Sequence, residues 1–294
     1  MTNQKIILVT GGAGFIGSNL CAHLVKDGHK VISLDNYFTG SRENHIKGVE
    51  YREGHTKDIE KHISETPDLI YHLGEYSRVA KSLEEPELVF DLNIVGTFGV
   101  LEFWRKKKCK FVYAGSSTKS VGAREDGTLG RNLAPYTWGK AVNSDLVNNY
   151  GRWYGLTYAI TYFYNVYGQG ERAGVDGYGT VVETFKQNYL HNRSHQIHSP
   201  GTQKRAFTHV DDTIEGIVLA GENGDGDGYG IAAKEQFTLL DLAHLFGGEI
   251  EMIPPTRTTR SGAGDVDTSK IEMLGWKQKK TLNGYIEEIK KQKK

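Results

Sequence analysis

A tyrosine and a lysine stand four residues apart in the stretch APYTWGK, residues 134–140. Proline is well tolerated in the first turn of a helix, so Pro135 predicts that a helix begins here. Tyr136 and Lys140 would then lie on the same helical face, one turn apart. A nearby positive charge favours the ionised form of a tyrosine, which could make Tyr136 an acid or a base. Among the sixteen tyrosines, about one such pair is expected by chance, so other motifs must decide.

A glycine-rich stretch, VTGGAGFIGSNL, is the second feature that could do chemistry. Gly11, Gly14 and Gly17 are three residues apart, between a strand-like run and an amphipathic segment. Glycines let the backbone approach a pyrophosphate, and a helix N-terminus offers N–H groups and a positive dipole end to it. Asp35 ends the next strand-like run, where a carboxylate can bind ribose hydroxyls and repel a 2′-phosphate. The pattern therefore predicts NAD rather than NADP as the cofactor.

The elements that must position these residues form a regular alternation. The strand-like runs are KIILVTGG, KVISLDN, VEYREG, LIYHLG, KFVYAGSS and LTYAITYFYNVYG, and most are separated by helix-like segments. Strands that alternate with helices predict right-handed crossovers and a doubly wound parallel α/β sheet. Apolar residues at helical spacing predict that the helix from Pro135 runs to about Tyr154. Further along the chain, ENGDGDGYG is interpreted as a turn-rich break.

The pattern loosens after Gly168, which indicates a smaller lobe interleaved with the end of the sheet. We expect a cofactor domain of residues 1–164 plus about 207–233, and a substrate lobe of residues 165–206 and 234–294. The loop of residues 168–179 is expected to line the substrate pocket.

The composition excludes several classes of protein. Formal net charge is zero, which gives no indication of a nucleic-acid or membrane partner. Cys21 and Cys109 provide neither a disulfide framework nor metal-ligand spacing, so no metal is expected. No charged leader and no apolar run of membrane-spanning length stand in the sequence. We therefore expect a soluble, cytoplasmic protein.

Taken together, these motifs resemble the extended short-chain dehydrogenase/reductase family, which includes NAD-dependent nucleotide-sugar epimerases and dehydratases. The resemblance covers nearly the whole chain. It includes TGGAGFIG, DNYFTGSREN, NIVGTFGVLEF, YTWGK, YFYNVYG and GTQKRAFTHVDD in the family's order. It implies a Rossmann-type sheet with a smaller C-terminal α/β substrate lobe, and a nucleotide-sugar substrate, with UDP favoured as the nucleotide.

The resemblance also implies residue roles. HLGEYSRV stands where the family usually has a His-Leu-Ala-Ala stretch beside the cofactor, and Asp58 matches an adenine-contacting position. Cofactor contacts are implied for Gly11, Gly14, Phe15, Ile16, Gly17, Asp35, Asn36, Asp58, Ile59, Leu73, Gly74, Asn93, Tyr136, Lys140 and Tyr164. Substrate contacts are expected for Glu75, Arg78, Thr118, Asn165, Arg205 and Arg260, with Arg257 as the alternative to Arg260.

The family's tyrosine takes a proton from a sugar hydroxyl while hydride leaves for NAD⁺, and its lysine binds the nicotinamide ribose. Tyr136 and Lys140 match these positions. A serine or threonine after the fifth strand binds the reacting hydroxyl. Counting from the strand start selects Ser116, and counting back from Gly122 selects Ser117. Insertions are easier in loops than in strands, so Ser116 is preferred and Ser117 kept as the alternative.

The reaction is predicted from the two residues directly after the serine pair. Sugar 4,6-dehydratases of the family carry an Asp-Glu pair there, and UDP-glucuronate decarboxylases usually carry a glutamate. This chain has Thr118 and Lys119, and elimination without an acid lacks its general base. A 4-epimerase needs none, because it oxidises C4, lets the 4-keto sugar rotate and returns the hydride to the other face. We therefore predict a nucleotide-sugar 4-epimerase.

Four alternatives remain open at this point, and a simple dehydrogenase is one of them. Glu75 could supply the missing acid, which would make the protein a dehydratase or decarboxylase. Glu75 and Arg78 could instead only form a salt bridge at the sheet edge. A non-catalytic NAD-sensing scaffold is another alternative, although such relatives tend to lose the tyrosine or the lysine. Finally, the helices from Pro135 and Glu87 carry surplus apolar residues, and in this family such helices pair across a two-fold axis, so a homodimer is expected.

Overall fold

The computed structural model describes residues 4–117, 130–172, 178–255 and 266–293. Its largest element is a seven-stranded sheet in the order β3-β2-β1-β4-β5-β6-β9, with every neighbouring pair parallel. The strands are β1 (Ile6–Thr10), β2 (Lys30–Asp35), β3 (Val49–Glu53), β4 (Leu69–His72), β5 (Lys110–Ser116), β6 (Tyr158–Phe163) and β9 (Gly226–Ile231). The strand order reverses between β1 and β4, so the predicted doubly wound α/β fold is confirmed.

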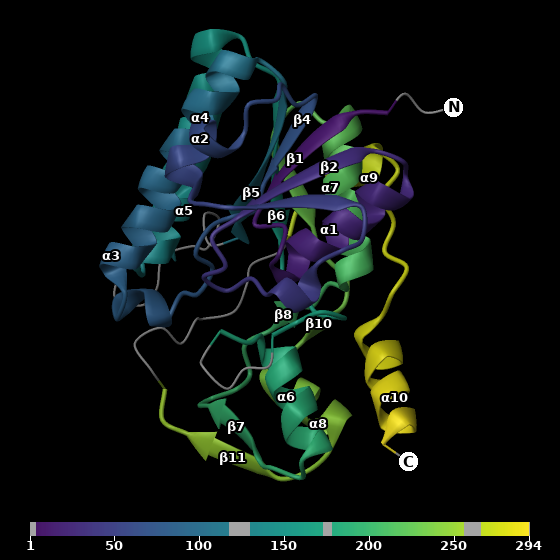
Figure 1. Cartoon of the computed structure of the whole chain (residues 1–294). Helices are drawn as coiled ribbons and strands as arrows, with labels where there is room; N and C mark the ends of the chain where they lie inside the picture. The colour runs from purple at the N-terminus through teal and green to yellow at the C-terminus, as the bar shows by residue number, and fades with distance from the viewer. Residues whose placement is uncertain (1–3, 118–129, 173–177, 256–265, 294) are drawn as a thin grey trace.

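Helices cover both faces of this sheet (Figure 1). One layer contains α2 (Ile59–His62), α3 (Pro86–Val89), a π-helix (Phe90–Val95), α4 (Gly96–Lys107) and α5 (Pro135–Tyr154). The other contains α1 (Phe15–Lys26), α7 (Val210–Asn223) and α9 (Ser269–Met273). Short 3₁₀ helices lie at Arg42–Asn44, Thr56–Asp58, Lys81–Leu83 and Gly130–Asn132.

Both faces of the sheet are buried, because successive side chains of a strand point to opposite sides. On β1, Ile7 and Val9 pack with α1 and α7, whereas Leu8 packs with α4 and α5. Helix α5 has the predicted bounds. It begins at Pro135 and is followed by Gly155 in the left-handed conformation (φ 62°), which lets the chain leave the helix.

A smaller lobe lies at one end of the sheet, in the lower part of Figure 1. Its elements are α6 (Val181–Leu190), β7 (His195–His198), β8 (Arg205–Ala206), β10 (Gln236–Phe237), α8 (Leu239–Phe246), β11 (Ile250–Ile253) and α10 (Leu282–Gln292). Two small sheets, β10-β8 and β11-β7, pair segments that are distant in sequence. The lobe has its own core, in which Phe185, Leu242, Phe246 and Ile286 are buried together.

The interpretation of ENGDGDGYG as a turn-rich break is wrong over its second part. Gly226–Ile231 forms β9, the last strand of the main sheet, beside β6. The glycines of β9 hide the alternation of side chains that is typical of a strand. One of them, Gly230, is required by close packing. A Cβ on Gly230 would lie 2.3 Å from the main-chain oxygen of Asp267. Glycine therefore permits the C-terminal segment to pass closely over the sheet edge.

The C-terminal segment around α9 packs against the sheet, not in the lobe core. Ile271 and Trp276 are buried among the residues of β1, α1 and α7. The indole Nε1 of Trp276 donates to the main-chain oxygen of Asp212, at 2.8 Å. We therefore propose to assign residues 267–276 to the cofactor domain, which changes the boundary that the sequence suggested. Over the described residues, no helix is long and apolar enough to cross a membrane.

Candidate active site

A cavity of about 510 Å³ lies at the carboxyl ends of the sheet strands. In open parallel sheets, ligands bind at this edge, where the strand order reverses. The loops after β1, β2, β4, β5 and β6 form its walls together with lobe residues such as Thr180 and Phe207. The predicted cofactor residues that line it are Gly11, Gly14, Phe15, Ile16, Gly17, Asp35, Asn36, Leu73, Gly74, Tyr136 and Lys140.

The glycine loop between β1 and α1 is tightly packed. Gly11 has φ +76°, and a Cβ there would lie 2.8 Å from the Cα of Gly74. A Cβ on Gly17 would lie 2.0 Å from the main-chain oxygen of Gly11. Helix α1 begins directly after Gly14, so its first N–H groups face a wall made of backbone. This cradle fits the pyrophosphate of a dinucleotide, which binds helix N-termini of this kind.

Asp35 lies at the end of β2 and also lines the cavity. Its carboxylate accepts the N–H of Ala13 at 2.9 Å and the N–H of Tyr37 at 2.8 Å. Burial raises the pKa of the Asp35 carboxyl above its usual value, although these two N–H groups favour the charged form. The carboxylate is therefore oriented by the backbone at the position predicted to bind the adenosine ribose.

The residues of the tyrosine–lysine motif meet the end of β5. The hydroxyl of Tyr136 lies 3.5 Å from Oγ of Ser116, at the outer limit of a hydrogen bond. Nζ of Lys140 donates to the main-chain oxygen of Ala114 at 2.6 Å. Ser116 and Ser117 both line the cavity, and it is Ser116 whose hydroxyl contacts Tyr136. Two hydroxyl groups and a lysine, supplied by α5 and the end of β5, thus converge on one wall.

Comparison with known proteins identifies this arrangement. The model of the NAD-dependent epimerase/dehydratase family matches residues 7–232. The chain belongs to this family. Its cofactor is NAD, as the family is NAD-dependent, and the glycine cradle and Asp35 fit that dinucleotide.

Relatives of this epimerase/dehydratase chain have several activities. A putative UDP-glucose 4-epimerase of Methanocaldococcus jannaschii is 31% identical, over 97% of each chain. UDP-glucuronic acid decarboxylase 3 of Arabidopsis thaliana is 29% identical, over 94% of this chain and 85% of the relative. Among solved structures, the UDP-glucose 4-epimerase of Thermotoga maritima, with UDP-glucose, has a TM-score of 0.87 at 27% identity, covering 98% of this chain and all of that one. The UDP-glucose 4-epimerase of Thermus thermophilus, with NAD, has a TM-score of 0.84 at 27% identity, over 96% of each chain.

The carboxylate of Glu75 is buried, which changes the interpretation made from the sequence. Glu75 is among the residues that line the cavity, but its side chain is only 1% exposed. The carboxylate accepts hydrogen bonds from Lys140, Thr97, Tyr113 and Asn143. The sequence suggested that this carboxylate contacts the substrate or acts as an acid at the cavity surface, and its burial does not favour either role. It is instead the buried ion-pair partner of the motif lysine.

Asn93 also differs from its predicted role. It lies in the π-helix, is fully buried and does not line the cavity. Its Oδ1 accepts the N–H of Tyr76 at 2.6 Å, and its Nδ2 donates to the main-chain oxygen of Tyr76 at 3.1 Å. This double contact pins the loop after β4, whose neighbouring residues do line the cavity. Asn93 therefore shapes the cavity wall, and the cofactor contact predicted for it stays a prediction.

Three other predicted cofactor residues lie away from the cavity. Asp58 forms an ion pair with Lys61 at 2.8 Å, and Ile59 is buried in the core beside α4. Tyr164 packs against that same core, whereas Phe163 and Asn165 line the cavity. Tyr164 directly follows Phe163, the last residue of β6, and successive side chains of a strand point to opposite sides. The cofactor contacts predicted for these three residues stay predictions.

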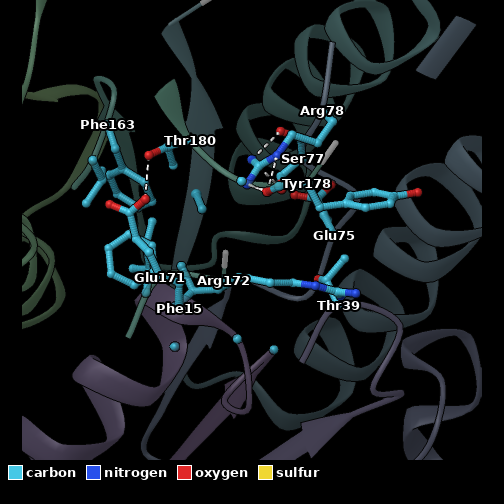
Figure 2. Close-up of a pocket in the computed structure, with 18 of the residues that line it drawn as sticks. Phe15, Thr39, Glu75, Ser77, Arg78, Phe163, Glu171, Arg172, Tyr178 and Thr180 are labelled. Atoms are coloured by element: carbon cyan, nitrogen blue, oxygen red, sulfur yellow. Dashed lines mark hydrogen bonds between the residues drawn. The ribbon is translucent and has the colours of Figure 1, made fainter. Parts of the chain in front are cut away.

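Several positively charged residues surround the cavity opening. Arg78, Arg172 and Arg205 all line it. Nε of Arg78 donates to the main-chain oxygen of Tyr178 at 2.7 Å, which ties the loop after β4 to the lobe. In Figure 2, Arg78 and Tyr178 lie on one side of the cavity, opposite Glu171 and Thr180. Guanidinium groups are suited to bind phosphate oxygens, so this region matches a diphosphate in chemistry.

Of the other residues predicted to contact the substrate, the structure describes only some. Asn165 lines the cavity in a left-handed conformation (φ 40°), and its Nδ2 donates to the main-chain oxygen of Ala206 at 2.8 Å. Thr118, Arg257 and Arg260 lie outside the described residues. In the part of the chain that the structure describes, no three His, Cys, Asp or Glu side chains are grouped so as to hold a metal ion.

The sequence reasoning missed three cavity residues with suitable chemistry: Arg172, Glu171 and Tyr178. All three belong to the loop of residues 168–179, which was expected to line the pocket without residue assignments. Glu171 accepts hydrogen bonds from the Gly168 N–H, at 2.9 Å, and from the Thr180 hydroxyl. Burial raises its pKa to about 7. The adjacent Glu-Arg pair in a glycine-rich loop was the available signal.

Proposed function

We propose that this protein is an NAD-dependent nucleotide-sugar 4-epimerase that acts on a UDP-hexose or a UDP-N-acetylhexosamine. The observation that carries the proposal is the convergence of Tyr136, Ser116 and Lys140 on one wall of the cavity. Thr118 and Lys119 stand where dehydratases and decarboxylases of the family carry acids. The burial of the Glu75 carboxylate argues against the acid that the sequence offered as a substitute. The UDP-glucose 4-epimerases among the similar proteins also favour this reaction.

Bound NAD⁺ supplies a hydride acceptor that later returns the hydride to the same carbon. Tyr136 takes the proton of the C4 hydroxyl while C4 is oxidised and returns it after the 4-keto sugar has rotated. Ser116 holds the same hydroxyl by a hydrogen bond, which fits its contact with Tyr136. Lys140 has three N–H groups, of which the backbone of Ala114 and the carboxylate of Glu75 accept two. The third is available for a ribose hydroxyl.

The diphosphate of the substrate is assigned to the positively charged region. Arg205 and Arg172 line the cavity from segments assigned to the lobe, and Asn165, which follows the end of β6, lines it as well. Two negative phosphates are best neutralised by guanidinium groups, which bind oxygens through paired N–H groups. The cavity thus has its proposed reacting groups on the sheet side and its phosphate ligands on the lobe side.

The test is NMR of the purified protein with a panel of UDP-hexoses and UDP-N-acetylhexosamines, without added NAD. Interconversion of a gluco/galacto pair is the expected result. A 4-keto-6-deoxy product would instead establish a dehydratase. Glu171, a lobe residue whose carboxyl group lies at the cavity, would then be the candidate acid. Tyr136→Phe should abolish turnover and keep cofactor binding. Unchanged behaviour of that variant would support the non-catalytic NAD sensor.

The two serines can be separated by the same assay. Ser116→Ala removes the hydroxyl that contacts Tyr136, so we expect kcat to fall roughly 100-fold or more. Ser117→Ala is the matched control and should lose less than about 10-fold. The opposite ranking of the two variants would transfer the role to Ser117.

We further propose a homodimer that forms through the layer of α3, the π-helix, α4 and α5. Phe90, Val95, Phe98 and Trp138 are large apolar residues of this layer that are 40–53% exposed. An exposed apolar patch on neighbouring helices is typical of a protein–protein interface. Sedimentation should show a dimer at micromolar concentration, and Phe98→Glu should shift it to monomer. A monomeric wild-type protein would refute the proposal.

A further inference from the structure

Glu75 is a buried carboxylate for which the proposed reaction has no direct use. It comes from the loop after β4, and its Oε2 accepts a hydrogen bond from Nζ of Lys140. Its Oε1 accepts from the Thr97 hydroxyl at 3.0 Å, the Tyr113 hydroxyl at 3.1 Å and Nδ2 of Asn143 at 2.9 Å. Four donors from α4, β5 and α5 therefore surround one carboxylate. A buried carboxylate with four hydrogen-bond donors is held in one position by the fold.

At neutral pH, this cluster contains one negative and one positive group. His72 from β4 hydrogen-bonds Thr97, and burial lowers its pKa to about 4, so it is neutral. Burial likewise raises the pKa of Tyr113, so its hydroxyl stays protonated. Burial, the largest single cause, would raise the pKa of Glu75, but the Lys140 charge, His72 and the hydrogen bonds from Lys140 and Asn143 together outweigh it and lower the pKa. Glu75 and Lys140 are thus the two charged groups facing each other here, with Tyr136 on the same face of α5.

The ion pair lies at the wall of the cavity. Lys140 and Glu75 both line it, as do residues of the glycine loop and of the end of β5. The side chains of Lys140 and Glu75 are 7% and 1% exposed, so water screens their charges poorly. A charged ligand group beside this wall therefore interacts with both members of the pair.

We propose that Glu75 is a positioning residue that holds the Lys140 ammonium and balances its charge, so that the site binds NAD⁺ more tightly, relative to NADH, than it would without this carboxylate. The nicotinamide ring is positive in NAD⁺ and neutral in NADH. A lone buried lysine beside the ring would disfavour the oxidised form, and a carboxylate paired with that lysine cancels the effect. The inference rests on the proposed function, because that function places the nicotinamide ribose beside Lys140.

The relative affinity for NAD⁺ and NADH matters for an epimerase. Its cofactor must return to NAD⁺ in every turnover, since the hydride that leaves C4 goes back to C4. A site that bound NADH too tightly would oppose the second hydride transfer and leave reduced cofactor behind. The Glu75–Lys140 pair therefore favours the resting form in which the enzyme can start its next turnover.

The test measures binding, not turnover. The dissociation constants of NAD⁺ and NADH are determined by calorimetry for cofactor-depleted wild type, Glu75→Gln and Glu65→Gln. A unit charge removed from a poorly screened site within about 10 Å changes an equilibrium constant by about tenfold. We therefore expect the ratio Kd(NAD⁺)/Kd(NADH) to rise about tenfold in Glu75→Gln. Glu65→Gln is the matched control, since Glu65 forms an ion pair with Arg52 at 2.6 Å and does not line the cavity, and its ratio should stay at the wild-type value.

A purely structural role would weaken the binding of both cofactor forms equally, and an unchanged ratio in Glu75→Gln would overturn the proposal. Glu75→Asp keeps the charge and shortens the side chain. It should preserve the wild-type ratio even where overall affinity falls, and a ratio like that of Glu75→Gln would also overturn the proposal. No sugar is needed, so this result is independent of the reaction found with the nucleotide-sugar panel.

Discussion

The buried carboxyl of Glu171 makes the stability of the cofactor-free protein depend on pH. Burial is the main cause that raises its pKa from 4.5 to about 7, and the charge of Glu183 adds to it. The hydrogen bond from Thr180 acts in the opposite direction and is outweighed. In the unfolded chain the carboxyl ionises at its ordinary pKa. Between these two values, the folded state binds more protons than the unfolded state.

The sign and the magnitude are set by this difference in proton binding. Below pH 4.5, Glu171 is protonated in both states and does not destabilise the fold. As pH rises towards 7, the unfolded state releases its proton first, so the free energy of unfolding falls. Above about pH 7, the loss in the free energy of unfolding stays constant. One pKa unit corresponds to about 1.4 kcal/mol, so the full loss is about 3 kcal/mol.

The assay is urea unfolding of wild type and Glu171→Gln at pH 5 and pH 8. Glutamine keeps an acceptor for the Thr180 hydroxyl and cannot ionise. The stability of the variant relative to wild type should therefore increase by about 2 to 3 kcal/mol between these pH values. Glu251→Gln on exposed β11 is the control and should follow wild type. Parallel pH dependence of wild type and Glu171→Gln would refute the reasoning.

Two further predictions concern the cradle and the C-terminal segment. Gly17→Ala should weaken NAD binding at least tenfold, measured by calorimetry, because its Cβ would lie 2.0 Å from the Gly11 oxygen. Gly139→Ala on α5 meets nothing closer than Ile94 at 3.6 Å, so it should bind NAD normally and gain about 0.5–1 kcal/mol in stability. Equal binding by both glycine variants would contradict the tight cradle. Trp276→Ala should lower the free energy of unfolding by about 3–5 kcal/mol, because the indole is 1% exposed in the sheet core. A loss below 1 kcal/mol in urea unfolding would contradict that packing.

Local patterns predicted most of the fold. The first six strands of the sheet were located from apolar runs, and Pro135 and the apolar spacing indicated both ends of α5. These signals are local, because a strand or helix needs a fixed periodicity to bury one side. The strand β9 was missed for the same reason. Gly226 and Gly228 remove the side chains on which periodicity depends, while the long-range contact with Asp267 that requires Gly230 has no local signature.

The sequence by itself determined the cofactor loop, the order of the motifs and the tyrosine–lysine pair, because each of these depends on spacing along one stretch of chain. The tertiary structure alone decided which way individual side chains point. It turned Glu75 inward to Lys140, used Asn93 to pin the neighbouring loop, and brought Ser116 to Tyr136. A buried polar side chain goes where donors from several elements converge, since an unbonded buried charge is costly. That convergence exists only after distant segments have packed together.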